Sequence, residues 1–207
     1  TLGLFAEQEL AGSWRMATDV RTTGDEIAAT LDGLLRLADL GRREVSGIAL
    51  SSVVPRLSTE YSTMAGRWFG VEALVVGPGV KTGMPILTND PRQVGPDLIV
   101  DAVAAYEACG GPCIAVDFGT ATTFSAVSAA GEYLGHAIAP GIEVSLDALS
   151  TRAARLMKIE LVDPGTVIGR NTLQAMQAGA IYGFAGQVDG IVARMRKELD
   201  APAAVTI

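Results

Sequence analysis

Residues 113–123, Cys-Ile-Ala-Val-Asp-Phe-Gly-Thr-Ala-Thr-Thr, constrain the fold of this chain more than any other stretch. The apolar run 114–116 follows a Gly-Gly-Pro sequence and predicts a short buried strand. Asp117 ends that run, and Gly119 allows the backbone to turn tightly or to approach a ligand closely. A second strand is expected at 124–127. We therefore expect a hairpin of two strands with a polar turn.

The turn of this hairpin combines a carboxylate and a glycine with hydroxyls on Thr120, Thr122 and Thr123. Backbone amides and hydroxyls can contact phosphate oxygens, and a carboxylate can hold a cation. No Gly-Lys-Ser/Thr sequence follows, so the segment is not a Walker loop. Two interpretations stay open here, a phosphate-binding turn and an ordinary hairpin with a polar turn.

The amino-acid composition narrows the class of protein. Apolar residues make up 49% of the 207 residues but aromatic residues only 5%, which predicts a substantial aliphatic core. The net charge of −7, without any basic run, argues against nucleic-acid binding.

Cys109 and Cys113, with the single histidine His136, do not make a zinc site and are expected to be reduced thiols. With no signal peptide or long uncharged apolar span, we expect a soluble cytoplasmic protein without membrane partners.

The N-terminal part alternates strands and helices. Thr23 and Glu26 form the pattern of a capping box and predict a helix start, and Pro55 suits the first turn of a second helix that stops at Gly70. The first helix is expected to end at Gly41. Four strands are expected, at residues 1–5, 10–18, 45–52 and 71–76, the first two antiparallel and the last one buried. This order predicts an α/β fold with some parallel pairing.

A loop-rich segment, 77–96, contains many prolines and glycines. A stretch of that length without regular structure in a compact domain is usually functional. It ends just before Asp97 and an apolar helix expected at 98–108. Asp97 is therefore either a helix cap, worth about 1 kcal/mol, or a functional carboxylate.

The C-terminal part repeats the N-terminal order loosely, because a third strand at 133–138 precedes a helix at 143–156. That order suggests an internal duplication.

A final long helix is expected at 172–199, and its glycines line one face, at Gly179, Gly183, Gly186 and Gly190. Each interior glycine costs about 0.5–1 kcal/mol relative to alanine. Close approach of another backbone would explain them, either within the fold or across a two-fold interface, and polar residues within the helix argue against a transmembrane dimer motif.

Taken together, several segments resemble the type III pantothenate kinases, bacterial enzymes of the actin-like, ribonuclease H-like ATPase superfamily. They occur in the family's order: Gly-Val-Lys-Thr-Gly-Met-Pro at 79–85, Asn-Asp-Pro-Arg-Gln-Val-Gly-Pro-Asp at 89–97, Val-Asp-Phe-Gly-Thr-Ala-Thr at 116–122, residues 135–141, and Gly-Arg-Asn-Thr at 169–172. The resemblance implies an α/β protein of two duplicated ribonuclease H-like domains with mixed sheets. The two halves would be residues 1–110 and 111–207, with ATP between them.

The resemblance also implies an activity, the ATP-dependent phosphorylation of pantothenate to 4'-phosphopantothenate, the first step of coenzyme A biosynthesis. ATP with Mg²⁺ would contact Gly119 and Thr120. Asp117 would hold a monovalent cation, K⁺ or NH₄⁺. No nucleic acid or membrane would take part.

The substrate side of the site follows from the same resemblance. Asp97 would be the general base for the pantothenate hydroxyl. Gly95, Pro96 and Leu98 would line the pantothenate site with it, and Thr172 would reach pantothenate from the neighbouring subunit of a homodimer.

This sequence departs from the family pattern at Leu98, where the pattern Gly-x-Asp-Arg has an arginine that helps to bind pantothenate. A leucine cannot pair with a carboxylate. An alternative therefore stays open: a catalytically altered paralogue that acts on another small hydroxy acid or serves as a nucleotide-binding regulatory protein. The family's first phosphate loop would precede Thr1 and its adenine-side Gly-Gly segment would follow Ile207, so the chain is expected to be cut at both ends.

Overall fold

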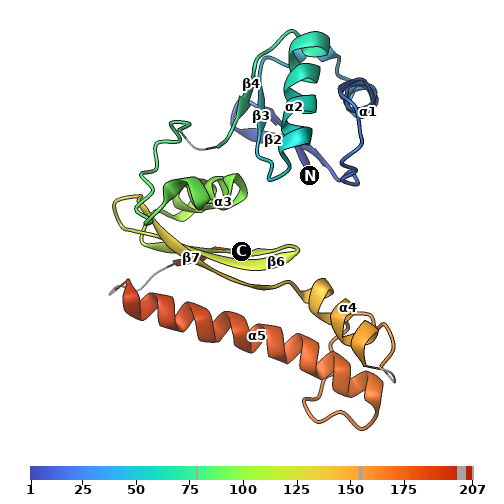
Figure 1. Cartoon of the computed structure of the whole chain (residues 1–207), viewed down its shortest axis with the longest axis vertical. Coiled ribbons are helices and arrows are strands. Elements are labelled where there is room, and N and C mark those ends of the chain that lie inside the picture. The colour runs from blue at the N-terminus through green and yellow to red at the C-terminus, as the bar shows by residue number, and fades with distance from the viewer. Residues whose placement is uncertain (78, 154–155, 200–203, 207) are drawn as a thin grey trace. The chain divides into compact units, whose positions relative to one another are not determined.

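A computed structural model describes residues 1–77, 79–153 and 156–199, and the backbone of 204–206 (Figure 1). Its contacts divide the chain into two units, one of Thr1–Val80 with Gly95–Asp97, the other of Lys81–Val94 with Leu98–Ile207. This grouping differs from the expected halves because it places residues 81–94 and 98–110 with the C-terminal strands. The overall class is mixed α/β, as expected.

The first unit holds two small sheets. β1 (Leu2–Ala6) and β2 (Glu9–Trp14) form an antiparallel hairpin, which confirms that prediction. β3 (Ile48–Leu50) and β4 (Ala73–Val75) pair in parallel, also as expected, although both strands are shorter than the sequence suggested. The prediction that the last of these strands is buried was wrong, because Leu74 at its centre is 56% exposed.

Two helices pack together in this unit. α1 (Gly24–Leu37) begins at a complete capping box, in which Thr23 is the N-cap and Glu26 reaches back to it. α2 (Pro55–Met64) has its proline at the first helical position, as predicted, and continues as a π-helical segment, Ala65–Phe69, that ends at Gly70 with φ +69°. The expected end of α1 at Gly41 was wrong; Gly41 instead precedes the 3₁₀ turn Arg42–Glu44.

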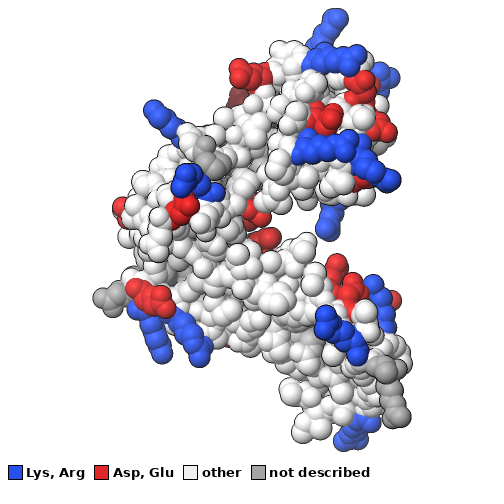
Figure 2. All heavy atoms as spheres, viewed as in Figure 1, with Lys and Arg blue, Asp and Glu red and all other residues white. Residues whose placement is uncertain are grey.

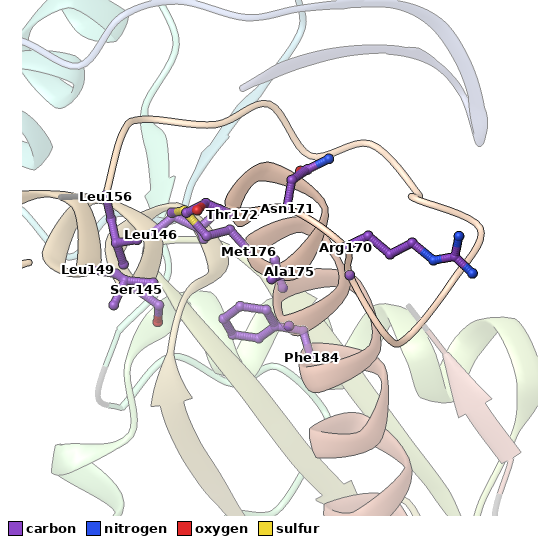
Figure 3. Close-up of a pocket in the computed structure, with 13 residues that line it drawn as sticks. Ser145, Leu146, Leu149, Leu156, Arg170, Asn171, Thr172, Ala175, Met176 and Phe184 are labelled. Atoms are coloured by element: carbon purple, nitrogen blue, oxygen red, sulfur yellow. The ribbon is translucent and has the colours of Figure 1, made fainter.

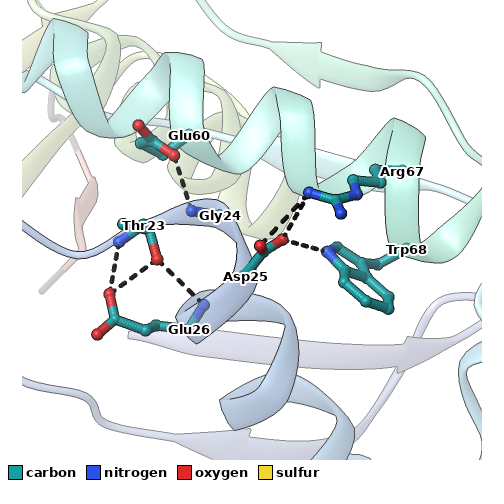
Figure 4. A network of polar contacts seen from close by, with 7 residues as sticks. All are labelled: Thr23, Gly24, Asp25, Glu26, Glu60, Arg67 and Trp68. Atoms are coloured by element: carbon teal, nitrogen blue, oxygen red, sulfur yellow. Dashed lines mark hydrogen bonds and ion pairs between the residues drawn. The ribbon is translucent and has the colours of Figure 1, made fainter.

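Polar contacts fix the start of α1 against α2 and the π-helical segment (Figure 4). The amide of Gly24 donates to Oε2 of Glu60 at 2.7 Å. Asp25 accepts from Arg67 at 3.1 Å and from the indole of Trp68 at 2.8 Å. Beneath them, Ile27, Ala28 and Met64 form a buried apolar cluster. The first helix pair is therefore held by burial, with polar contacts that fix its register.

The second unit is built on a four-stranded sheet in the order β7-β6-β5-β8. Its strands are β5 (Cys113–Phe118), β6 (Ala121–Val127), β7 (Tyr133–Pro140) and β8 (Ala204–Thr206). β5 and β6 pair antiparallel, which confirms the predicted hairpin. β7 pairs antiparallel with β6, whereas β8 pairs in parallel with β5.

Helices cover both faces of this sheet (Figure 1). α5 (Thr172–Glu198) packs on the face that contains Ile114, Val116 and Phe124, with Val192 buried among them. α3 (Pro96–Cys109) lies over the opposite face, and α4 (Ile142–Arg152) follows β7 at the end of the sheet. The helix expected at 143–156 thus ends at Arg152, and residues 154 and 155 lie outside the described part of the chain. A further 3₁₀ turn, Pro91–Gln93, interrupts the long loop.

Charged side chains on the face shown in Figure 2 are scattered, with basic and acidic groups side by side. In the first unit, Arg36 and Arg42 both pair with Asp32, at 2.9 and 2.8 Å. Among the described residues, no helix is both long and apolar enough to cross a bilayer.

We predict that Thr23→Ala lowers the free energy of unfolding by about 1 kcal/mol, because it removes the side-chain oxygen that accepts from the amide of Glu26. Gly33→Ala is the matched control. Gly33 lies exposed in the same helix with open space around its Cβ position, so alanine should stabilise by about 0.5–1 kcal/mol. Urea titrations followed by circular dichroism measure both changes. Equal stability of the two variants would contradict this account of α1.

Candidate functional site

The turn between β5 and β6 presents a carboxylate beside a tight backbone reversal. Asp117 pairs with Thr123, and the amide of Gly119 donates to the carbonyl of Ala121 at 2.9 Å. Side chains alternate between the faces of a strand, so Asp117 lies on the face opposite to Val116, away from α5. Gly119 and Asp117 are both exposed. The turn therefore offers an exposed carboxylate next to exposed backbone.

The Asp117 carboxylate offers oxygen ligands beside the turn. Within the described part of the chain its carboxylate has neither a hydrogen-bond nor an ion-pair partner. One Asp117 oxygen lies 3.2 Å from the place that a Cβ on Gly119 would take, so the carboxylate folds over the turn. Carboxylate, hydroxyl and carbonyl oxygens are the donors that hard cations prefer. The described residues contain no group of three or more His, Cys, Asp or Glu that could hold a metal.

The three threonine hydroxyls of the turn do not have the same surroundings. Thr120 is exposed at the tip. Thr122 is fully buried, and its Oγ1 has no hydrogen-bond partner among the described atoms. The expectation that Thr122 contributes its hydroxyl to a phosphate contact was therefore wrong in this conformation. Because Phe124 lies on the same face of β6, alternation directs Thr122 toward α5.

Asp97 is the second residue of α3 and is exposed. Its carboxylate folds back over the preceding turn, so that a Cβ on Gly95 would overlap Oδ1 of Asp97. An acidic side chain in the first turn is also favoured by the helix dipole. Both interpretations of Asp97, helix start and functional carboxylate, are compatible with this place. Pro96 opens the helix, and Leu98 is 6% exposed and so belongs to the apolar interior.

A cavity of about 640 Å³ opens between α4, the N-terminal half of α5 and the segment that joins them. Thr172, the first residue of α5, lines it beside Asn171, whose side chain caps the helix by accepting from the amide of Gln174 at 2.9 Å. Figure 3 shows Phe184 and Met176 reaching from α5 toward α4, whereas Arg170 points away. The wall is mostly apolar: Ser145, Leu146, Leu149, Leu156, Gly169, Ala175, Met176, Gly179, Ala180 and Phe184.

The segment 156–171, called here the strap, is fastened along α5. The hydroxyl of Tyr182 donates to Oδ1 of Asp163 at 2.8 Å, and the side-chain amide of Gln177 donates to the carbonyl of Glu160 at 3.2 Å. Gly169 packs so closely on the first turn of α5 that a Cβ would overlap the backbone of Ala175. These contacts fix the approach of the chain to Thr172.

The glycines of α5 face open space. A Cβ at Gly179, Gly183 or Gly186 would meet no described atom within 4 Å, and at Gly190 it would meet only the side chain of Arg194, at 3.4 Å. The explanation that another segment of the described chain packs on these glycines is therefore wrong. Their surface is free to receive something else.

The two cysteines lie at the junction of α3 and β5. Cys109 is exposed and Cys113 is buried, and neither forms a disulfide. Burial first, and then the neighbouring Cys109 sulfur, raises the pKa of the Cys113 thiol to about 11. Cys113 is therefore a protonated, weakly nucleophilic core residue.

The sequence did not predict which residues line the cavity or which contacts hold the strap on α5. Ser145 and Phe184 come from different helices, and no local pattern relates them. Asp163 and Tyr182 are 19 residues apart, so their contact depends on the tertiary path of the strap. A useful signal was available for Gly169, because the Gly-Arg-Asn-Thr segment combines a close-packing glycine with an N-cap asparagine.

A mixed α/β sheet with an exposed carboxylate at a strand end and a Gly-Thr turn beside it is typical of enzymes that bind nucleotide phosphates. The comparisons with known proteins agree. The sequence model of the family described as type III pantothenate kinase matches residues 1–194. This chain belongs to the type III pantothenate kinase family.

Curated relatives are similar along the whole chain. The type III pantothenate kinases of Streptomyces avermitilis and Streptomyces griseus subsp. griseus are each 54% identical over 212 residues, which cover 100% of this chain and 80% of each relative. That of Moorella thermoacetica is 52% identical over 204 residues, which cover 99% of this chain and 80% of the relative.

We predict that acid loosens the strap, because protonation of Asp163 weakens its contact with Tyr182. The hydrogen bonds from the amide of Gly165 and from Tyr182 lower the pKa of Asp163, and the contact with Asp163 raises the pKa of Tyr182. A lowered carboxyl pKa gives stabilisation that is complete above the ordinary value of 3.8 and is lost as the pH falls through the lower folded value. The raised tyrosine pKa keeps the contact intact into the alkaline range.

Hydrogen exchange of residues 156–171, corrected for the intrinsic pH dependence of the exchange rate, measures this loosening. Protection should be constant from about pH 5 to pH 9 and should fall below about pH 4. Tyr182→Phe should weaken the protection at neutral pH. Unchanged protection in this variant would show that Asp163 and Tyr182 do not hold the strap.

Proposed function

We propose that this protein transfers the γ-phosphoryl group of ATP to the hydroxyl of pantothenate and so makes 4'-phosphopantothenate, the first step of coenzyme A biosynthesis. The observation that carries the proposal is the family match over residues 1–194, together with relatives of that activity at 54% identity over the full chain. The exposed turn at Gly119 gives this chemistry a place in the fold. Because ATP is made and used in the cytoplasm, we propose that the enzyme acts there.

The turn would serve the nucleotide. Backbone and hydroxyl groups of Gly119 and Thr120 would contact the ATP phosphates, and Asp117 would hold a monovalent cation, K⁺ or NH₄⁺. Such a cation, with the Mg²⁺ that accompanies ATP, supplies positive charge that offsets the charge of the phosphates. The Asp117 carboxylate is exposed and has no hydrogen-bond or ion-pair partner among the described residues, which supports this role.

Asp97 would be the general base. It would accept the proton of the pantothenate hydroxyl as that oxygen bonds to the γ-phosphorus and the bond to ADP breaks. Its exposure at the start of α3, with no hydrogen-bond or ion-pair partner in the described part of the chain, leaves it available for this task. Gly95, Pro96, Leu98 and Thr172 would line the pantothenate site with it.

Leu98 supports a second candidate function, phosphorylation of another small hydroxylated acid. A bound carboxylate normally gains a charge-assisted partner worth about 1.5–3 kcal/mol, and a buried leucine offers none. A panel of hydroxy acids assayed beside pantothenate decides between the two. A substrate preferred over pantothenate would favour the second candidate, and ATP binding without turnover of any acid would favour a regulatory protein.

The finer fold proposal is a pair of duplicated ribonuclease H-like halves, residues 1–110 and 111–207. The second sheet supports it, since three antiparallel strands are followed by β8, parallel to β5. In the first unit, an antiparallel hairpin is again followed by a parallel pair.

We also propose a homodimer that uses α5. Large apolar side chains are exposed around the cavity, at Val144, Leu149, Met157, Leu161, Val162, Val167, Ile168 and Leu173, with Ile168 83% exposed. An apolar surface of this kind normally receives a partner. The open glycines of α5 allow a second helix to approach closely. Thr172 at the edge of this surface would then serve the neighbouring subunit's site.

We expect Asp97→Asn to abolish pantothenate-dependent turnover, with a loss of about 10²–10⁴-fold, because the amide cannot accept the proton. ATP binding by calorimetry and the melting temperature should stay within error of the unchanged protein. Near-normal turnover would show that Asp97 is not the general base and only stabilises the start of α3.

Activity should depend on K⁺ or NH₄⁺ and should be low in Na⁺ alone. Asp117→Ala should remove both the dependence and most of the turnover, because the carboxylate that offers oxygen ligands is gone. Rates measured in chloride salts of the three cations at constant ionic strength test this. Equal rates in Na⁺ and K⁺ for the unchanged protein would rule out the cation site.

Gly183→Leu should block close helix approach and convert a dimer to monomers that also bind pantothenate poorly. Because no described atom lies within 4 Å of a Cβ at this position, the fold should be retained, which circular dichroism checks. Gly33→Leu, on the exposed face of α1, is the control for a leucine in place of an open glycine. Light scattering that finds the unchanged protein monomeric at micromolar concentration would refute the proposed interface.

A further inference from the structure

Gly141 joins the end of β7 to the start of α4 and lies directly against the Gly119–Thr120 turn. Its amide donates to the carbonyl of Thr120 at 3.0 Å. Its own carbonyl accepts from the amide of Ser145 at 3.0 Å, in the first turn of α4. One buried residue therefore connects the turn to a helix start.

A glycine is required at position 141 because there is no room for a Cβ, and not because the backbone conformation demands it. Gly141 has φ −67° and ψ 162°, a conformation that any residue adopts. A Cβ at this position, however, would overlap the carbonyl oxygens of both Gly119 and Thr120. These atoms are backbone and cannot rotate away as a side chain can. An alanine would therefore have to displace the turn itself, the β7–α4 junction, or both.

A Cβ at Gly111 or Gly169 would also overlap backbone, that of Ser128 or Ala175, but neither glycine lies against the Gly119–Thr120 turn. At Gly119 the nearest neighbour of a Cβ would be Oδ2 of Asp117, at 3.2 Å, which is the far end of a side chain. At Gly33 nothing described lies within 4 Å. Within the second unit, Gly141 is thus the glycine whose missing side chain leaves room for the turn that carries Gly119 and Thr120.

We infer that Gly141 is a positioning residue for the nucleotide and cation side of the site, an inference that rests on the proposed function. The amide of Gly141 holds the carbonyl of Thr120, and its Cα packs directly against the backbone of the turn. Gly141 therefore fixes the position of the turn relative to the end of β7. The position of Asp117 depends on the same turn, since its carboxylate folds over Gly119. Substitution at Gly141 therefore affects ATP and the cation, whereas the groups expected to bind pantothenate belong to other segments.

The test compares Gly141→Ala with Gly33→Ala in the whole protein. For Gly141→Ala we expect the KM for ATP and the activation constant for K⁺ to rise at least about tenfold, and kcat to fall by on the order of 100-fold, because small displacements of positioned groups are costly. The KM for pantothenate should change less than about twofold, since the residues that line its site are untouched. Gly33→Ala should match the unchanged protein in all four constants.

A second measurement does not depend on turnover. Calorimetry without pantothenate should show weaker ATP binding by Gly141→Ala, and hydrogen exchange should show reduced protection confined to the turn and the start of α4. Wild-type ATP binding, an equal rise of the ATP and pantothenate KM, or failure of the variant to fold would each overturn the inference. If the unchanged protein had no pantothenate-dependent turnover, the proposed function would fail, while ATP binding by the two variants would still test Gly141.

Discussion

The packing of α5 on the β5–β6–β7 sheet is the interaction on which the rest of the second unit depends. Ile114, Val116 and Phe124 are at most 3% exposed and meet Val192 and its neighbours on the helix. Burial of large apolar side chains is worth about 1.5–3 kcal/mol each, more than any surface contact described above. With its interior fixed in this way, the sheet can present Asp117 and the adjoining turn at an exposed end.

Local chemistry explains what could be predicted from the sequence. Thr23 and Glu26 form the capping box that their spacing predicted. Asp117 follows a buried run of β5 and lies close to Gly119, as the pattern also predicted. Each of these predictions depends on residues within a few positions of one another. The same holds for Gly70, whose positive φ ends the second helix.

What could not be predicted depends on contacts between distant parts of the chain. Thr122 was grouped with the other hydroxyls, but the face of β6 that it occupies is decided by where α5 packs. The glycines of α5 predicted close approach of another backbone, but only the fold shows that no described segment covers them. Gly141 was visible only as part of a motif, because its neighbour in space is a turn 21 residues earlier.

α5 is long enough for its two ends to have different structural roles. Its 27 residues span about 40 Å at the usual rise per residue. The C-terminal part, around Val188 and Met195, is committed to the sheet, while the part near Thr172 lines the cavity. A change at the cavity end of α5 therefore leaves the core of the sheet in place, whereas a change near Val188 or Met195 disturbs it.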